Sequence, residues 1–244
     1  MLEVRELHKS FGKVRAVQGV SFVARDGEIT GLLGPNGAGK TTTLRMLYTL
    51  MRPDSGQVLV DGLDANADRI AARRKLGVLS DARGLYKRLT ARECIEYFGR
   101  LHGLEREVAK ARAQALIDEL DMGAIAERRT EGFSQGERVK TAIGCALVHD
   151  PRNVILDEPT NGLDVMATRR MRTLIRGFKG SGRSVLFSSH IMQEVAALCD
   201  RIVVIVKGQV VAKGTTDELR QSTGEENLEE DFVKVIGSEE GLAA

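Results

Sequence analysis

Residues 34–41 read Gly-Pro-Asn-Gly-Ala-Gly-Lys-Thr, which has the spacing G-x-x-x-x-G-K-T of a phosphate-binding loop. Glycines let such a loop turn tightly, so that its backbone N–H groups can surround phosphate oxygens. Lys40 is placed to reach the β- and γ-phosphates of a nucleotide, and the Thr41 hydroxyl is placed to bind Mg²⁺. The loop predicts a nucleotide site built from Gly34, Asn36, Gly37, Ala38, Gly39, Lys40, Thr41 and Thr42.

The segments on both sides of this loop are those that a phosphate-binding loop requires. Residues 28–33 form a short apolar run typical of a buried strand, and residues 41–51 place leucines at helical spacing. The helix adds unpaired N–H groups and the positive end of its dipole. A chance match to the motif arises in roughly one chain in a hundred of this length, and the strand–loop–helix order makes chance less frequent still.

A second segment supplies carboxylates. Residues 153–157 read as an apolar strand that ends in Asp157 and is followed by Glu158, which is the Walker B pattern. We expect Asp157 to hold Mg²⁺ through water and Glu158 to polarise the water that attacks the γ-phosphate. A solvated carboxylate pair at a strand end is the plain alternative, and the phosphate-binding loop upstream favours the catalytic interpretation.

Ser134 opens another helix. Ser134 and Glu137 have the spacing of a capping box, and the exposed N–H groups of a helix N-terminus can also bind an anion. Ser134 could serve as a helix cap and as part of an anion site at the same time, because a cap leaves other N–H groups of the helix available.

The order of these motifs resembles the ATP-binding subunits of ABC transporters. The resemblance covers roughly residues 2–220 and rests on the loop at 34–41, Phe-Ser-Gln-Gly-Glu at 133–137, Leu-Asp-Glu-Pro-Thr at 156–160, Asn-Gly-Leu-Asp at 161–164 and Ser-Ser-His at 188–190. It implies ATP and Mg²⁺ as ligands and a head-to-tail homodimer formed on ATP binding. Each ATP would then lie between the loop of one copy and Ser134 and Gly136 of the other, with Asp164 at the seam.

The same resemblance assigns roles to two aromatic side chains. It implies that His190 contacts the γ-phosphate and the region of Glu158, which makes Lys40, Glu158 and His190 the candidate catalytic residues. A lone histidine is more often structural, but His190 follows a strand at the carboxyl end of the sheet, where ligands bind. Phe11 matches the aromatic residue that stacks on adenine, and a core aromatic beside a strand is its alternative.

The sequence also departs from the family pattern. Asp81 stands where the family has glutamine, and it is retained as a candidate metal ligand beside Thr41 and Asp157. Gln135 and Glu137 replace the usual glycine and glutamine. These departures and the segments 79–86, 133–138, 165–168 and 236–241 resemble bacterial sodium-extruding ABC exporters, which makes the sodium ion the expected cargo.

The 244 residues are expected to form an α/β fold: a P-loop NTPase core of mainly parallel strands with an antiparallel β piece and an inserted helical subdomain. We expect one ABC ATPase domain over 1–222, with the core at 1–81 and 151–222 and the helical subdomain at 82–150. Residues 223–244 form a short acidic tail. The core strands are expected at 2–8, 14–23, 28–33, 57–60, 76–79, 153–157, 184–188, 202–206 and 209–212.

The composition of the chain limits the kinds of partner that it is expected to bind. A net charge of +2 gives no argument for nucleic acid, and three widely spaced cysteines suit a reducing compartment. No apolar run approaches the roughly 20 residues that cross a bilayer, so another chain would have to supply any membrane span. The resemblance to ABC transporters implies that this other chain is a transmembrane permease subunit, which would hold the present chain at the cytoplasmic face of the membrane. Alternatives are an exporter ATPase for a drug or lipid and a soluble, non-transport ABC ATPase. A GTPase lacks support because the chain has no Asn-Lys-x-Asp segment, and Glu158 and His190 argue against a non-hydrolysing sensor.

Overall fold

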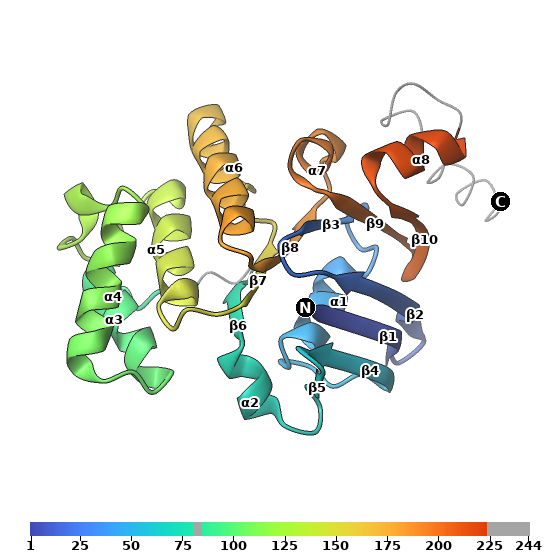
Figure 1. Cartoon of the computed structure of the whole chain (residues 1–244), viewed down its shortest axis with the longest axis horizontal. Helices are drawn as coiled ribbons and strands as arrows, with labels where there is room; N and C mark the ends of the chain where they lie inside the picture. The colour runs from blue at the N-terminus through green and yellow to red at the C-terminus, as the bar shows by residue number, and fades with distance from the viewer. Residues whose placement is uncertain (81–83, 224–244) are drawn as a thin grey trace.

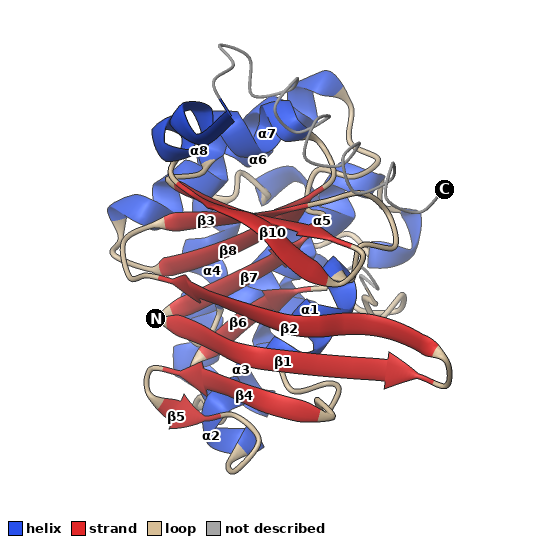
Figure 2. Cartoon of the chain, turned by 90° about the vertical axis from the view of Figure 1, so that its right-hand side faces the viewer, coloured by secondary structure: helices blue, strands red, loops and turns tan. Residues whose placement is uncertain are grey.

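The computed structural model describes residues 1–80 and 84–223, which contain two β-sheets with helices around them (Figures 1 and 2). The strands are β1 Leu2–Phe11, β2 Val14–Ala24, β3 Ile29–Leu33, β4 Ser55–Val60, β5 Leu63–Asp64, β6 Leu76–Leu79, β7 Asn153–Asp157, β8 Ser184–Ser189, β9 Arg201–Val206 and β10 Gln209–Gly214. The helices are α1 Lys40–Leu47, α2 Arg69–Arg74, α3 Ala91–Leu101, α4 Arg106–Glu119, α5 Gln135–Leu147, α6 Val165–Gly180, α7 Met192–Leu198 and α8 Thr216–Thr223, with short 3-10 turns at Gly123–Ile125 and Thr130–Gly132.

The larger sheet has the strand order β10-β9-β3-β8-β7-β6, and all its neighbouring pairs are parallel except β10 with β9. Strands β3, β7 and β8 are buried along their whole length, as expected for a parallel sheet covered on both faces. Leu33 pairs with Ser189, and Asp157 pairs with Ser188. The carboxyl ends of these strands therefore meet at one edge, where an open α/β sheet binds its ligands.

Apolar side chains form two clusters. One joins the smaller antiparallel sheet, β2-β1-β4-β5, to α1 and one face of the parallel sheet. The other joins the opposite face of the parallel sheet to α6, α7 and the helices α3, α4 and α5. Those three helices lie together at one end of the molecule in Figure 1, between β6 and β7 in the sequence. The α/β fold with parallel and antiparallel strands is confirmed, and the subdomain limits at residues 82 and 150 stay a prediction.

Several element boundaries differ from the sequence-based expectation. The sequence of residues 65–75 predicts a short helix over that whole range, but α2 begins only at Arg69. The Asp64 carboxylate accepts the N–H groups of Asn66 and Ala67 in a turn, and Asp68 then caps the helix. The helix expected at 41–51 ends at Leu47. The predicted capping box at Ser134 is formed. Thr90 and Glu93, which have the same spacing and residue types and so predict a second box, form one at the start of α3.

Two groups of predicted residues lie outside the described part of the chain. Asp81 falls between the two described segments, and residues 224–244, which include the segment 236–241, follow the second one. Within residues 1–80 and 84–223, none of the helices has the length and apolar composition that a membrane crossing requires.

Candidate nucleotide-binding and catalytic site

The phosphate-binding loop connects β3 to α1 and is held closely by its neighbours. A Cβ atom on Gly34 would lie 2.1 Å from the Ile205 carbonyl oxygen, and one on Gly39 would lie 2.4 Å from that of Ala16. Gly39 also has φ +101°, a left-handed conformation that side chains rarely adopt. These positions admit only glycine, which explains the spacing of the motif in packing terms.

A cavity of about 420 Å³ opens above this loop. It is lined by Ala16, Asn36, Gly37, Ala38, Gly39, Lys40, Thr41, Thr42, Glu158, Asn161 and His190. Seven of the eight predicted loop residues line it, Lys40 among them. The other two candidate catalytic residues, Glu158 and His190, also line it and directly follow β7 and β8. Gly34 is not among the lining residues, and its carbonyl instead accepts a hydrogen bond from Lys40 Nζ at 2.7 Å.

Lys40 is the buried cation of the cavity. Its residue is 5% exposed, and Nζ also donates to the Pro35 carbonyl at 3.1 Å. Burial lowers the pKa of Lys40, although the charges of Glu158, whose Oε1 lies 3.6 Å from Nζ, and of Asp157 act in the opposite direction. The ammonium is therefore short of compensating negative charge, and an anionic phosphate group would supply it. The cavity fits ATP in this respect.

Glu158 points from the end of β7 toward that cation. Its backbone has φ +48°, an uncommon conformation for a glutamate, and its N–H donates to Ser188 Oγ at 3.0 Å. Glu158 Oε2 lies 2.8 Å from His190 Nδ1. Strained backbone of this kind occurs at functional sites, where the surroundings hold it in place.

The candidate Mg²⁺ ligands are arranged for an ion that keeps water around it. Asp157 is fully buried, accepts the Ser188 hydroxyl at 2.7 Å and is not among the cavity-lining residues, whereas Thr41 is. The described residues contain no group of three or more His, Cys, Asp or Glu side chains suited to a metal. Mg²⁺ accepts such a site because it binds few protein groups and takes other ligands from phosphates and water. The prediction for Asp81 lies outside the described residues.

The predicted second half of the nucleotide site lies elsewhere. Ser134, Gly136 and Asp164 line a different cavity of about 600 Å³, which shares no lining residue with the first. Ser134 Oγ accepts the N–H of Glu137 at 3.3 Å, and the Asp164 carboxylate accepts the N–H of Ala167 at 2.7 Å, so both side chains cap helices. Within one chain they are not brought to the phosphate-binding loop.

Phe11 ends β1 at the tip of a hairpin. It is 48% exposed, its ring centre lies 5.9 Å from Lys9 Nζ, and it is not among the residues that line the cavity. Ala16 on the partner strand of the same hairpin does line it. An exposed ring is not a core aromatic, so the alternative interpretation of Phe11 is wrong, while its contact with adenine stays a prediction.

Sequence reasoning missed two residues here. Ser188 holds both Asp157 and Glu158, and Asn161 lines the cavity. The signal for Ser188 was available, because a serine near the end of a buried strand needs a polar partner. Asn161 carried no comparable signal, since asparagine is ordinary in a loop.

Comparisons with known proteins agree with this geometry. A family model described as ABC transporter matches residues 17–161. The chain belongs to the ABC transporter family. It is 44% identical over 224 residues to the ABC transporter ATP-binding protein NatA of Bacillus subtilis (strain 168), covering 91% of each chain. It is 36% identical to the linearmycin resistance ATP-binding protein LnrL of the same organism, covering 93% of this chain and 73% of that protein.

Solved structures agree with this assignment. A structure described as the ATP-binding subunit of an ABC transporter has a TM-score of 0.88 and 30% identity, covering 96% of this chain and 99% of that chain. A dimeric post-hydrolysis structure of the ATP-binding cassette MJ0796 with ADP and Pi has a TM-score of 0.79 at 24% identity, covering 88% of this chain and 98% of that chain, and shows the shared fold. The present chain is thus an ATP-binding subunit of an ABC transporter and an ATPase of that type.

Proposed function

We propose that ATP is hydrolysed in the cavity between the phosphate-binding loop and Glu158, and that hydrolysis drives an exporter through a separate permease. The observation that carries the site assignment is the approach of Glu158 to both Lys40, at 3.6 Å, and His190, at 2.8 Å, beside the loop. These groups come from three separate segments of the chain. Their convergence on one cavity supports catalysis better than a solvated carboxylate at a strand end does.

Each side chain has a distinct proposed role. Lys40 neutralises charge on the β- and γ-phosphates, and Glu158 orients the attacking water and accepts its proton. His190 holds the Glu158 carboxylate through the 2.8 Å contact and lies where it can meet the γ-phosphate. Thr41 and Asp157 hold Mg²⁺, which when bound neutralises phosphate charge during transfer.

Two copies complete each site in this proposal. Ser134, Gly136 and Asp164 line a cavity separate from the phosphate-binding loop of their own chain, so they can serve ATP only across an interface. A head-to-tail dimer with twofold symmetry brings the two cavities of different copies together twice. The MJ0796 cassette, which is described as dimeric with ADP and Pi bound, gives a precedent for a dimer of this fold.

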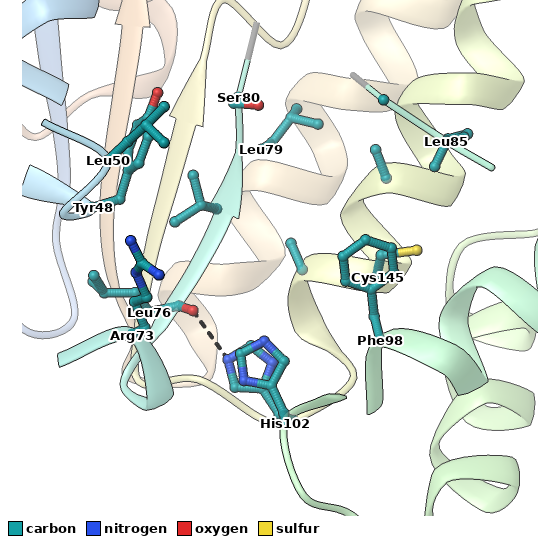
Figure 3. Close-up of a pocket in the computed structure, with 15 residues that line it drawn as sticks. Tyr48, Leu50, Arg73, Leu76, Leu79, Ser80, Leu85, Phe98, His102 and Cys145 are labelled. Carbon is teal, nitrogen blue, oxygen red and sulfur yellow. Dashed lines mark hydrogen bonds between the residues drawn. The ribbon is translucent and has the colours of Figure 1, made fainter. Parts of the chain in front are cut away.

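The permease is proposed to dock in a third cavity, of about 430 Å³, between the core and the helices α3 and α5. Figure 3 shows Tyr48, Leu50 and Arg73 on one side and Leu85 and Phe98 on the other. Leu50 is 66% exposed and Tyr86, which follows Leu85, is 51% exposed. Exposed apolar side chains beside a groove favour an interaction surface over an internal core. In this proposal the chain lies at the cytoplasmic face of the membrane.

The proposed cargo is the sodium ion. Its support is the resemblance of residues 79–86, 133–138, 165–168 and 236–241 to sodium-extruding exporters. Export of a drug or lipid is the second candidate, and it is favoured by relatives named for linearmycin resistance and for daunorubicin resistance, at 36% and 37% identity.

The cargo is tested with inside-out vesicles that hold the chain and its permease. ATP should drive sodium uptake into wild-type vesicles, and vesicles with Glu158→Gln should show only the passive leak. Uptake equal to that of Glu158→Gln, with ATP-driven movement of linearmycin or daunorubicin instead, would reject sodium and leave the ATPase assignment in place.

A further inference from the structure

A buried carboxylate connects the segments that carry Glu158 and His190. Glu194 of α7 is 3% exposed, and its Oε2 atom accepts hydrogen bonds from Thr160 Oγ1 at 2.7 Å and from Ser189 Oγ at 3.0 Å. Thr160 lies two residues after Glu158, and Ser189 directly precedes His190. One oxygen atom therefore joins both segments, although Glu194 itself does not line the ATP cavity.

The other side of this carboxylate faces α6. Arg172 Nη2 lies 3.5 Å from Glu194 Oε1, and α6 begins directly after Asp164. Ser189 Oγ in turn accepts the N–H of Ile191 at 3.0 Å. Both oxygens of Glu194 thus face donors, which is the condition for burying a charge without a large penalty.

We propose that Glu194 is a positioning residue for ATP hydrolysis, which keeps Glu158 and His190 in contact without touching the nucleotide; this rests on the roles proposed above for those two residues. The backbone of Glu158 has φ +48° and keeps that conformation only where its surroundings impose it. Ser188 fixes the segment at Glu158 itself, and the bond from Thr160 to Glu194 fixes it two residues later. Without the second anchor, the carboxylate is free to shift relative to His190.

Four variants separate positioning from stability in the full-length chain. Thr160→Val and Ser189→Ala each remove one hydroxyl donor, and Glu194→Leu removes the acceptor. Glu194→Gln keeps one oxygen for both hydroxyls and is the conservative rescue. Ser184→Ala is the matched control, because Ser184 is also a fully buried serine on β8 and donates one hydrogen bond, to the Ala24 carbonyl at 3.1 Å, at the opposite end of the strand.

The measurements are kcat, the Kd for Mg-ATP and Tm. We expect Thr160→Val and Ser189→Ala to lower kcat about tenfold with Kd within about twofold, since small displacements of catalytic groups affect turnover far more than binding. Glu194→Gln should retain kcat within about threefold of wild type, and Glu194→Leu should lose at least as much as the hydroxyl variants. Ser184→Ala should lower Tm no more than Ser189→Ala does, because Ser189 also accepts the Ile191 N–H, and it should keep wild-type kcat.

The proposal is overturned if Ser189→Ala and Ser184→Ala have equal kcat values, or if Glu194→Gln is as damaged as Thr160→Val. If Glu194→Leu does not fold, the two hydroxyl variants still decide. Glu158→Gln is assayed in parallel. Turnover by Glu158→Gln would reject the proposed role of Glu158, whereas an inactive Glu158→Gln with fully active hydroxyl variants would reject only the role of Glu194.

Discussion

Replacing Lys40 with methionine should separate the stability of the free chain from its ability to bind ATP. The ammonium is buried, and burial lowers its pKa despite the nearby carboxylates, so the charge is less favourable in the folded chain than in the unfolded one. Methionine fills similar space without a charge. The loss of the bonds to Gly34 and Pro35 is therefore offset, and the unfolding free energy without nucleotide should change by less than about 1 kcal/mol.

The effect on ATP binding should be much larger. A charge-assisted hydrogen bond contributes about 1.5–3 kcal/mol, so the Kd for Mg-ATP should rise about a hundredfold. At an ATP concentration of about 100 times the wild-type Kd, the nucleotide stabilises the folded protein by about 2.7 kcal/mol, and in Lys40→Met by about 0.4 kcal/mol. With about 2–4 °C per kcal/mol at this chain length, the ATP-induced rise in Tm should fall from about 5–10 °C to about 1 °C.

The assay is thermal unfolding with and without Mg-ATP. Lys110→Met is the control, because Lys110 lies on α4, pairs with Glu107 at 3.3 Å and does not line the cavity. It should keep the full ATP-induced shift. The reasoning is refuted if Lys40→Met keeps an ATP-induced Tm shift of about 5 °C or more. It is also refuted if the substitution lowers the free energy of unfolding without nucleotide by more than about 3 kcal/mol.

Three further predictions follow from other parts of the molecule. Glu158→Gln should form a dimer with saturating Mg-ATP and stay a monomer without it by light scattering, and a persistent monomer would argue against the composite site. Tyr86→Asp should abolish ATP-driven cargo uptake while basal ATPase stays near wild type, whereas Val108→Asp, at an exposed position on α4 outside the docking groove, should affect neither. Burial and the stacked His102 ring lower the pKa of His149 to about 4 from an ordinary value near 6.5. The unfolded chain therefore binds a proton that the folded chain does not, and stability should fall by about 1–2 kcal/mol, after allowance for solvent screening, as pH falls from about 6.5 to 4. His149→Gln should flatten this loss in denaturation measurements and exposed His8→Gln should not.

The parallel strands were predicted well from the sequence because buried strands consist mainly of apolar residues. Residues 154–156 are apolar and lead to Asp157, and the structure has the strand at the predicted bounds, Asn153–Asp157. The helix boundaries were less predictable where side chains compete with the helix for backbone N–H groups. Asp64 binds two of them in a turn, so α2 starts four residues later than helical spacing suggests.

The candidate site was predictable where one local segment contains all its parts. The loop from Gly34 to Thr42 is such a segment, and seven of its eight predicted residues line the cavity. Glu194 was not predictable, because its partners lie 5 and 34 residues away in the sequence and meet it only through the fold. No local sequence pattern around a glutamate on a short helix predicts such long-range contacts.

Ser188 links the carboxylate of Asp157 to the backbone of Glu158. Its hydroxyl donates to Asp157 Oδ1 at 2.7 Å and accepts the N–H of Glu158 at 3.0 Å. The Ser188 hydroxyl therefore uses its proton in the bond to Asp157. It uses a lone pair to accept the backbone N–H of Glu158, the residue with the left-handed conformation. If Asp157 moved toward a bound cation, it would pull on the Ser188 hydroxyl, which also holds the backbone N–H of Glu158. The carboxylate proposed for Mg²⁺ is thus connected, through one buried side chain, to the backbone of the residue proposed for water activation.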